Sequence, residues 1–465
     1  MSASSATTPA GGAPAPSQPP ALPRLLAGIP AEGAMALDEH LAVHGGPPIV
    51  RGRGRRDDRE HAELLIEEVE RSGLLGRGGA AFPTAAKMRA VAGSRGRATV
   101  ILNAAEAEPA SLKDRTLLEA LPHLVLDGGL LAARAVGADE LVICVGEPAQ
   151  AALDCLGAAL AERADAEEYA ALERIAHVRL IGVPGHYVAG QETALINYAG
   201  GGPAKPLFTP PMPFEHGLRR RPTLVNNAET LAHVALIARH GAPWFRQLGT
   251  PAQPGSALVT LAGPVAHPGV YEIEHGASLS SLIDAGGGTT AGVRGALIGG
   301  YAGSWIGAEL LRGIALSNEH LAAHGATLGA GVVLLLSEET CPVAETARLA
   351  RWLSDQSAGQ CGPCVHGLDA LAAGIEELGR GDGGGRAAQR VERIASLVLG
   401  RGACRHPDGA VNVLLSGLEV FHAEFADHAR HGPCELCGRP GELPLPSRPV
   451  PPDPPRRSFI RVGGR

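Results

Sequence analysis

With 465 residues, the chain exceeds the size at which a single hydrophobic core stops growing, so we expect two to four domains. Its net charge of −7, with no basic stripe carrying interleaved aromatic residues, argues against nucleic acid as a partner. No uninterrupted apolar run reaches the length of about 18 residues that a membrane-spanning helix needs, so we expect no membrane span.

The first 35 residues are rich in Ala, Pro and Ser and have no apolar signal core, which is typical of a disordered tail. Residues 36–60 form a polar, Arg-rich segment that leads to the first domain, so residues 1–60 are predicted to precede that domain. Four of the eight cysteines form two C-x-x-C pairs, a pattern that favours metal or redox chemistry over disulfides. We therefore expect a cytoplasmic protein with a metal or redox centre.

A glycine-rich loop runs from Gly76 to Lys87 and follows a helical pattern over residues 61–70. Three glycines in four positions, then a Pro-Thr step into an Ala-rich run, suit a loop whose backbone N–H groups converge on an anion at a helix N-terminus. Arg77 and Lys87 would add charge-assisted contacts, and Lys87 is one of only three lysines in the chain. Taken alone the loop could equally be a surface turn. If it binds a ligand, phosphate is the group that we expect.

Strands and helices alternate after this loop. Strands are predicted at 98–103, 141–145 and 178–183, and helices at 117–135 and 149–164. This alternation is typical of a mostly parallel, doubly wound α/β sheet. The first strand ends at Asn103 and is followed by Glu106 and Glu108, which places these residues at the carboxyl edge where open α/β sheets bind ligands.

Two more loops carry polar residues toward helix starts. The third strand leads into Gly190-Gln191-Glu192-Thr193, where Glu192 and Thr193 can satisfy first-turn amides. A Pro-rich loop over residues 203–222 leads to Asn226-Asn227, which opens a helix. Neighbouring asparagines are often only turn formers.

The pattern changes after residue 254. Short strands at 258–261, 270–273 and 332–336 with a helix at 278–285 suit a small β-grasp module over residues 255–336, which we interpret as an architectural spacer. A helical domain is predicted over residues 338–432, opening with a helix from 341 to 355. Residues 433–465 form a Pro-rich tail that contains Cys434 and Cys437.

These motifs, in their order and spacing, resemble those of the NADH-binding flavoprotein subunit of respiratory complex I and its hydrogenase and formate dehydrogenase relatives. The resemblance covers roughly residues 61–430. It rests on the stretches Gly78 to Lys87, Asn103 to Arg115, Gly190 to Leu195, Asn226 to Ala232, Ala262 to Glu272 and Cys361 to Cys404. It implies a Rossmann-like FMN and nucleotide domain over residues 61–250, a soluble-ligand-binding β-grasp domain, and a C-terminal α-helical iron–sulfur bundle.

The resemblance also implies the residues of the site. FMN would be held by Arg77, Gly78, Gly79, Ala80, Lys87, Asn103, Asn226, Asn227 and Thr230. The space where nicotinamide meets flavin would be lined by Glu106 and Glu108, the candidate catalytic carboxylates, with Tyr187, Gly190 and Glu192. Phe82 would be the retained nucleotide-stacking residue.

Several positions depart from the family pattern. The Asn-Ala-Asp-Glu motif becomes Asn-Ala-Ala105-Glu, and Gly-Glu-Glu becomes Gly-Gln191-Glu, so two carboxylates are replaced. The two other stacking positions hold Ala90 and Met212. A stacking platform is worth about 0.5–1.5 kcal/mol beyond its buried area. We therefore expect an eroded dinucleotide site, a largely preserved flavin site and weaker discrimination against NADPH.

The cluster motif Ser-Cys-Gly-x-Cys-x-Pro-Cys has Ala358 at its first cysteine, which leaves Cys361, Cys364 and Cys404 as metal ligands. The fourth ligand could be Ser357, His366, Cys341, or one of Cys434 and Cys437. Either a 4Fe-4S or a 3Fe-4S cluster is possible. A different reading pairs Cys361 and Cys364 with Cys434 and Cys437 as a zinc site.

The resemblance implies an oxidoreductase in which FMN takes electrons from NADH or NADPH. The iron–sulfur cluster would pass them to a protein acceptor, such as a ferredoxin or a complex of the quinone-reductase type. The protein would be cytoplasmic, either free or held at the periphery of a membrane complex through its partners. The alternative is a degenerate member that serves as an electron-relay or assembly subunit without NADH turnover.

Overall fold

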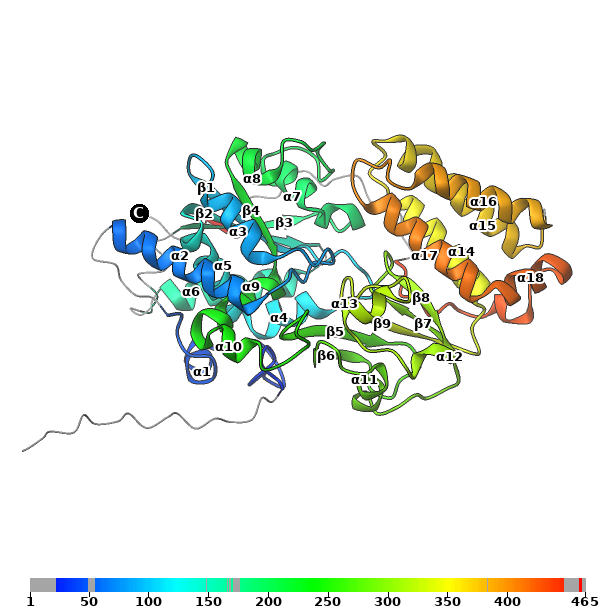
Figure 1. The fold of residues 1–465 in the computed structure, drawn as a ribbon, viewed down its shortest axis with the longest axis horizontal. Coiled ribbons are helices and arrows are strands. Elements are labelled where there is room, and N and C mark those ends of the chain that lie inside the picture. Colours follow the sequence, from blue (N-terminus) through cyan, green and yellow to red (C-terminus); the bar gives the residue numbers. More distant parts are fainter. Residues whose placement is uncertain are drawn as a thin grey trace, which may run out of the picture.

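The computed structural model describes residues 22–48, 55–147, 149–164, 166, 169, 176–382, 384–446 and 460–461. An α/β unit, a second sheet, and a helical region follow one another along the chain (Figure 1). Most of the two predicted tails, residues 1–21, 447–459 and 462–465, lies outside the described residues.

The first sheet has the strand order β10-β3-β2-β1-β4. Its parallel strands are β1 (Ala98–Ala104), β2 (Ala138–Gly146), β3 (His177–Val183) and β4 (Thr223–Asn227), and β10 (Ile460–Arg461) pairs antiparallel with β3. Nearly every residue of β1 and β2 is buried, as expected for strands covered on both faces. The predicted parallel α/β sheet is confirmed, and β4 is a strand that the sequence did not reveal.

Alternate residues of these strands enter two separate apolar cores. Val100 and Leu102 face the larger core, whereas Ile101 faces a smaller one completed by Leu195 and Ile196 of α7 (Glu192–Ala199). Helices that accompany this sheet are α2 (Arg55–Ser72), α3 (Thr84–Ala92), α4 (Lys113–Ala120), α5 (Pro122–Ala135), α6 (Gln150–Ala164), α8 (Pro213–His216), α9 (Ala228–His240) and α10 (Ala242–Phe245). The sheet is therefore buried between helical layers.

The helix predicted over residues 117–135 is two helices. Pro122 occupies the first turn of α5, where its missing N–H is tolerated, and it ends α4 at Ala120. The two axes differ by 99°. Gly128 of α5 is required because a Cβ there would lie 1.8 Å from the carbonyl oxygen of Leu231 in α9.

Part of the predicted N-terminal tail is folded. Residues 22–48 include α1 (Leu37–Val43), and Arg24 is buried with its guanidinium 4.0 Å from the ring centroid of Trp244. The backbone N–H groups of Arg24 and Leu26 both donate to Glu272 Oε2, at 2.7 and 3.1 Å. Composition alone did not show that this segment has buried polar partners.

The second sheet has the order β6-β5-β9-β7-β8. Its strands are β5 (Ser256–Ala262), β6 (Gly269–Glu274), β7 (Val293–Ile298), β8 (Ser304–Gly307) and β9 (Val332–Ser337), accompanied by α11 (Leu279–Ala285), α12 (Ala308–Leu311) and α13 (Asn318–Ala322). The strands predicted near 258, 270 and 332 are present. The sequence did not reveal β7 and β8, because the glycines at 299, 300 and 303 between them favour a loop prediction.

The C-terminal region is helical, as predicted. It contains α14 (Pro342–Asp355), α15 (Leu368–Gly379), α16 (Gly384–Val398), α17 (His406–Val420) and α18 (His422–His431), with a π-helical turn at Pro363–Gly367 and a 3₁₀ turn at Glu435–Gly438. Among the described residues no single helix is long and apolar enough to cross a membrane, and only the bent α4–α5 pair meets the criteria of length and composition.

Candidate functional site

The order of the first sheet creates a switch point beside β1. The chain passes from β1 to β2 and β3 on one side, then returns to β4 on the other side of β1. Ligands of open α/β sheets bind at such a point, outside the carboxyl ends of the strands. Asn103 of β1 lies in register with Asn227 of β4, and Leu102 with Asn226, so the structure brings the three predicted asparagines to this edge.

The loop after β3 is fastened to the same edge. Asn103 Nδ2 donates to the carbonyl oxygen of Gly190 at 2.9 Å, while Asn103 Oδ1 accepts from the N–H of Ala105 at 3.1 Å. A Cβ at Gly190 would lie 2.6 Å from the carbonyl oxygen of Ala105. Glycine is therefore the residue that permits this close approach between the two loops.

The glycine loop and α3 face this edge from the other side. Lys87 Nζ donates to Glu192 Oε1 and to the carbonyl oxygen of Val225, both at 3.2 Å. Gly78 packs closely enough that a Cβ there would lie 3.3 Å from Asn227 Cβ, and Gly79 has a φ of +105°. Lys87 and Glu192, both only partly exposed, thus meet where the three loops converge.

Arg77 is turned into the protein interior. Its guanidinium donates to the carbonyl oxygens of Leu75 and Ser256 at 2.9 Å, and its backbone N–H donates to Thr230 Oγ1 at 2.8 Å. Burial lowers the pKa of Arg77, and Glu229 opposes this effect. The Arg77 side chain and the Thr230 hydroxyl therefore hold the glycine-rich loop in place. An anion would be bound by the backbone N–H groups of this loop and not by the Arg77 guanidinium.

A buried ion network lies beneath the loop. Lys113 Nζ contacts Asp114 Oδ1 at 2.8 Å and Glu229 Oε2 at 2.9 Å, and all three side chains are buried. Arg77 Nε lies 3.7 Å from Glu229 Oε1, which also accepts from the N–H of Leu258 in β5. Burial favours a neutral Lys113, but the charges of Asp114 and Glu229 outweigh it and raise the Lys113 pKa. Asn227 joins this network through Asp114, which accepts from Asn227 Nδ2.

The two candidate catalytic carboxylates have structural partners. Glu106 accepts hydrogen bonds from Ser111 Oγ and from the backbone N–H groups of Asp114 and Arg115, so it caps the first turn of α4. Burial raises the pKa of Glu106, as does the charge of Asp114. A catalytic role for Glu106 stays a prediction.

Glu108 lies at a joint between the three parts of the chain. Its Oε2 accepts from the backbone N–H of Tyr301 at 2.8 Å and from the Tyr187 hydroxyl at 3.3 Å. The N–H of Tyr187 donates to Gln356 Oε1 at 2.9 Å, and its ring packs against Trp352. Burial raises the pKa of Glu108 to about 7, although its hydrogen bonds act in the opposite direction.

The predicted stacking residue Phe82 is half exposed, as is Met212 at one of the positions where the family has an aromatic residue. Two further aromatic residues that could stack on a nucleotide were not predicted from the sequence. They are Phe208 and Phe214 in the Pro-rich loop, which are 71% and 37% exposed. The carbonyl oxygen of Phe214 accepts from Ser94 Oγ, just beyond α3. Two of only seven phenylalanines in one short loop are the signal that could have identified these residues.

The edge offers groups that suit FMN. Asn226 is buried, and its Nδ2 has no hydrogen-bond partner among the described residues, so a donor is available there. The loop backbone at Gly78 and Gly79, together with Lys87, suits the phosphate, and amide side chains suit the ribityl chain and the ring edges. These residues therefore fit FMN, and their individual roles stay predictions.

Cys361 and Cys364 lie between α14 and α15, and Cys404 lies between α16 and α17, and the fold brings the three thiols together. Burial raises the pKa of the Cys364 thiol to about 12, and the neighbouring Cys361 and Cys404 thiols add to this effect. Ala358 is buried beside them, with its backbone within hydrogen-bonding reach of Cys364. Three soft ligands with an apolar fourth position fit an iron–sulfur centre that has three cysteine ligands from the described residues.

The zinc pairing considered from the sequence is wrong. Cys434 and Cys437 gather with Cys341 and His428, and not with Cys361 and Cys364. Cys341, Cys434 and Cys437, considered as a fourth cluster ligand, therefore lie together in a group that includes neither Cys361 nor Cys364. Sequence spacing could not reveal it, because its members span residues 341–437.

Comparisons with known proteins agree with this site. The chain matches the models for the Nuo51 FMN-binding domain over residues 69–236, the SLBB domain over 258–300 and the NADH-ubiquinone oxidoreductase-F iron-sulfur binding region over 344–428. The two models that match the longest stretches are named for FMN binding and for iron–sulfur binding, which are the two cofactors expected from the motifs.

Similar proteins come from several bacteria. The F 2 subunit of NADH-quinone oxidoreductase from Rhizobium meliloti is 32% identical over 80% of this chain and 90% of the relative. The NADP-reducing hydrogenase subunit HndC of Solidesulfovibrio fructosivorans is 30% identical, over 86% of this chain and 82% of the relative.

A solved structure, an NAD⁺-reducing [NiFe]-hydrogenase in the H₂-reduced state, is similar with a TM-score of 0.75 and 31% identity over 80% of this chain. This chain spans 64% of that hydrogenase chain. The resemblance read from the motifs and the predicted fold class are thereby confirmed. The chain belongs to the family formed by the F subunits of NADH-quinone oxidoreductases.

Proposed function

We propose that this protein oxidises NADH or NADPH with FMN bound at the switch-point edge of the first sheet, and passes the electrons through an iron–sulfur centre to a protein acceptor. The observation that carries the proposal is the convergence of Asn103, Gly190, Asn226 and Lys87 on one edge of a chain that also carries the iron–sulfur binding region. FMN, when bound, accepts two electrons as a hydride and releases them singly.

Different residues at the sheet edge would contact different parts of the FMN and the nucleotide. Lys87 would neutralise phosphate charge. Asn226 Nδ2, which has no partner in the described part of the chain, would donate to an acceptor on the cofactor. Gly190 would keep the β3 loop close to β1, which leaves the cofactor face free of a side chain. The exposed rings of Phe82, Phe208 and Phe214 would offer apolar surface to the bases of the nucleotide.

The relatives are named as subunits of oxidoreductases and hydrogenases. We therefore propose that this chain also works inside a complex, peripheral to any membrane, and that a ferredoxin-like or other redox subunit takes its electrons. The alternative is a relay or assembly subunit without turnover of NADH. Ala90 and Met212 at the stacking positions and Ala358 at the cluster favour that alternative. An anaerobic absorption spectrum before and after NADH addition separates the two, because only the first reading predicts flavin bleaching.

Lys87→Ala is expected to weaken FMN binding about ten- to a hundredfold, because a charge-assisted hydrogen bond contributes about 1.5–3 kcal/mol. Flavin content after gel filtration and fluorescence titration with FMN would measure the loss. Lys205→Ala is the matched control, because Lys205 contacts Asn197 through its backbone, whose carbonyl oxygen accepts from Asn197 Nδ2 and is kept in the variant. Unchanged FMN affinity in the Lys87 variant would remove Lys87 from the site.

NADPH is expected to be a better electron donor for this protein than for relatives that carry carboxylates at positions 105 and 191. Those carboxylates would repel the 2′-phosphate of NADPH, and here Ala105 and Gln191 replace them. Gln191 Oε1 accepts from the N–H groups of Thr193 and Ala194, so this residue caps α7 without a negative charge. Gln191→Glu keeps the capping oxygen and restores the charge, and should lower the ratio of kcat/KM for NADPH over NADH about tenfold, which corresponds to about 1.4 kcal/mol. The kcat/KM for NADH serves as the internal control. An unchanged ratio would contradict the charge argument.

A further inference from the structure

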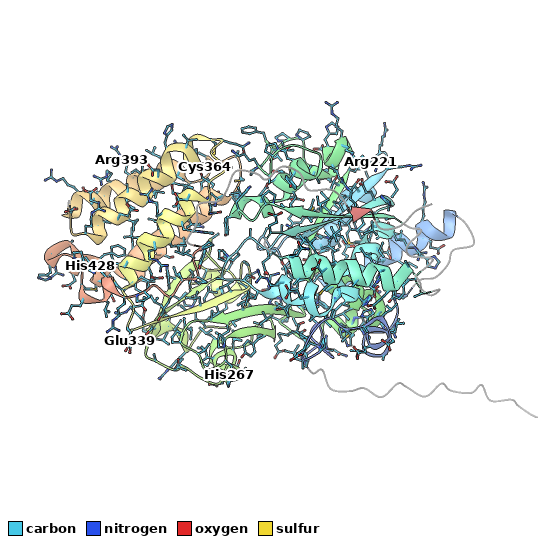
Figure 2. All side chains as sticks on the ribbon, turned by 180° about the vertical axis from the view of Figure 1, so that it is seen from behind. Arg221, His267, Glu339, Cys364, Arg393 and His428 are labelled. Carbon is cyan, nitrogen blue, oxygen red and sulfur yellow. The ribbon has the colours of Figure 1, made fainter. Side chains whose placement is uncertain are left out.

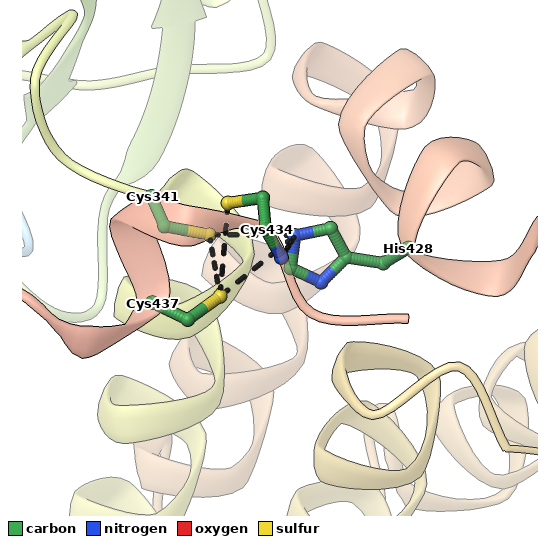
Figure 3. Close-up of side chains that lie close together, drawn as sticks. All are labelled: Cys341, His428, Cys434 and Cys437. Carbon is green, nitrogen blue, oxygen red and sulfur yellow. Dashed lines mark hydrogen bonds between the residues drawn. The ribbon is translucent and has the colours of Figure 1, made fainter. Parts of the chain in front are cut away.

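Four metal-binding side chains meet at the end of the helical region (Figure 3). Cys341 immediately precedes α14, and His428 lies in α18. Cys434 immediately precedes the turn Glu435–Gly438, and Cys437 lies within it. Cys341 and His428 are buried and the other two are partly exposed. One ligand atom from each residue lies within 4.8 Å of the others.

The distances match the edges of a tetrahedron around one ion. Cys437 Sγ lies 3.5 Å from Cys341 Sγ and 3.7 Å from Cys434 Sγ. His428 Nε2 lies 3.7 Å from Cys341 Sγ and 3.9 Å from Cys437 Sγ. With metal–sulfur bonds of about 2.3 Å, a tetrahedral site has sulfur–sulfur edges of about 3.8 Å. An iron–sulfur cubane would hold each thiolate on a different iron and spread the sulfur atoms further apart.

The second shell prepares His428 for a metal. Its Nδ1 lies 2.9 Å from the carbonyl oxygen of Gly379 at the end of α15. A proton on Nδ1 satisfies this carbonyl and leaves Nε2 unprotonated beside the Cys341 and Cys437 sulfur atoms. In the structure Nε2 also accepts the backbone N–H of Cys434 at 3.4 Å, a contact that a bound ion would replace. Cys434 and Cys437 form a tight turn in which the N–H of Cys437 donates to the carbonyl oxygen of Cys434 at 3.0 Å. The N–H of Ala344 in α14 points at Cys341 Sγ at 3.4 Å, which fixes the position of this sulfur atom.

This group is separate from the iron–sulfur centre. The iron–sulfur binding region of the family spans residues 344–428, so all three cysteines of the group lie outside it. Cys364 and His428 lie well apart along the helical region (Figure 2). Three thiolates and one imidazole in a tetrahedron form a frequent structural zinc set, and four protein ligands leave no open position for catalysis. We propose that Cys341, His428, Cys434 and Cys437 bind one zinc ion.

The ion would fasten the C-terminal segment to the rest of the chain. Beyond Cys437, the N–H of Leu443 donates to Glu345 Oε2 in α14, and the N–H of Ser337 at the end of β9 donates to Glu442 Oε2. The Leu443 side chain is buried. The zinc site would thus fix a segment that crosses from the helical region to the second sheet.

The test is metal analysis of the full chain. The wild type, Cys155→Ser and Cys361→Ser should each contain one zinc per chain, whereas Cys437→Ser should lose zinc and keep its flavin and iron. Cys155 is the matched control because it lies on α6 in the first domain. Trypsin should then cut faster after Arg430, an exposed residue in the last turn of α18 between His428 and Cys434, in the Cys437 variant than in the controls.

Zinc that stays in Cys437→Ser, or iron in place of zinc, would overturn the proposal. Zinc-edge X-ray absorption of the wild-type chain gives a second test that does not depend on the variant folding. We expect three sulfur neighbours at about 2.3 Å and one nitrogen at about 2.0 Å, and a first shell dominated by oxygen would contradict the site.

Discussion

Ala358→Cys is expected to convert an air-sensitive centre into a stable four-iron cluster. Ala358 is 5% exposed, and its backbone lies against the Cys364 thiol. In the sequence it stands where the resemblance implies the first cysteine of the cluster motif. Without that thiolate, one iron must take an oxygen or nitrogen ligand and exchanges more readily, because soft ligands select and retain iron. The wild type purified in air should therefore rest as a three-iron cluster.

Electron paramagnetic resonance and iron content measure this change. The wild type should give a three-iron signal that converts on anaerobic addition of iron, and Ala358→Cys should hold four irons through purification. Ala358→Ser is the matched control, since it adds a side-chain oxygen of similar size without a thiolate. Cys404→Ser should abolish the cluster. A four-iron cluster that survives air in the wild type would show that a further strong ligand completes the site.

Lys113→Met is expected to cost about 3–5 kcal/mol of stability, because it leaves Asp114 and Glu229 as buried charges without their nearest cation. Arg89 on α3 offers a matched control, because it pairs with Glu63 and Glu70 at the surface. Such pairs contribute about 0–1 kcal/mol, so Arg89→Met should have little effect.

Thermal denaturation of the flavin-loaded protein would compare the variants. The double variant Lys113→Met with Glu229→Leu removes one charge of each sign, and should recover part of the loss because the two residues are coupled. A Lys113 variant that melts at the same temperature as the Arg89 variant would show that the network beneath the loop does not hold the first domain together.

Much of the fold could be predicted because its strands are short apolar runs bounded by loops. β1, β2 and β3 lie where the pattern of Val, Ile and Leu places them. β4 escaped prediction because two of its five residues are Asn226 and Asn227, which favour turns in isolation. Tertiary pairing with β1 decides their conformation, and sequence alone does not report that pairing.

The sequence predicted which residues gather at the candidate site better than it predicted the role of each. Lys87, Asn103 and Asn226 converge on one edge, yet the Arg77 side chain and Glu106 are engaged in holding the backbone. The Cys₃His group was beyond the sequence, because His428 is one of 18 histidines and nothing local distinguishes it. Its membership depends on the fold that brings residues 341 and 437 together.

The carboxylate of Glu108 also limits how the molecule can move. One oxygen is shared by the Tyr301 amide and the Tyr187 hydroxyl, and the Tyr187 amide ends on Gln356, so one point ties the first domain to both others. Rotation of either of the other two domains away from the first would break one of these bonds. We therefore expect a nucleotide to enter and leave without a hinge between domains, and melting to spread from any one of them to the whole chain.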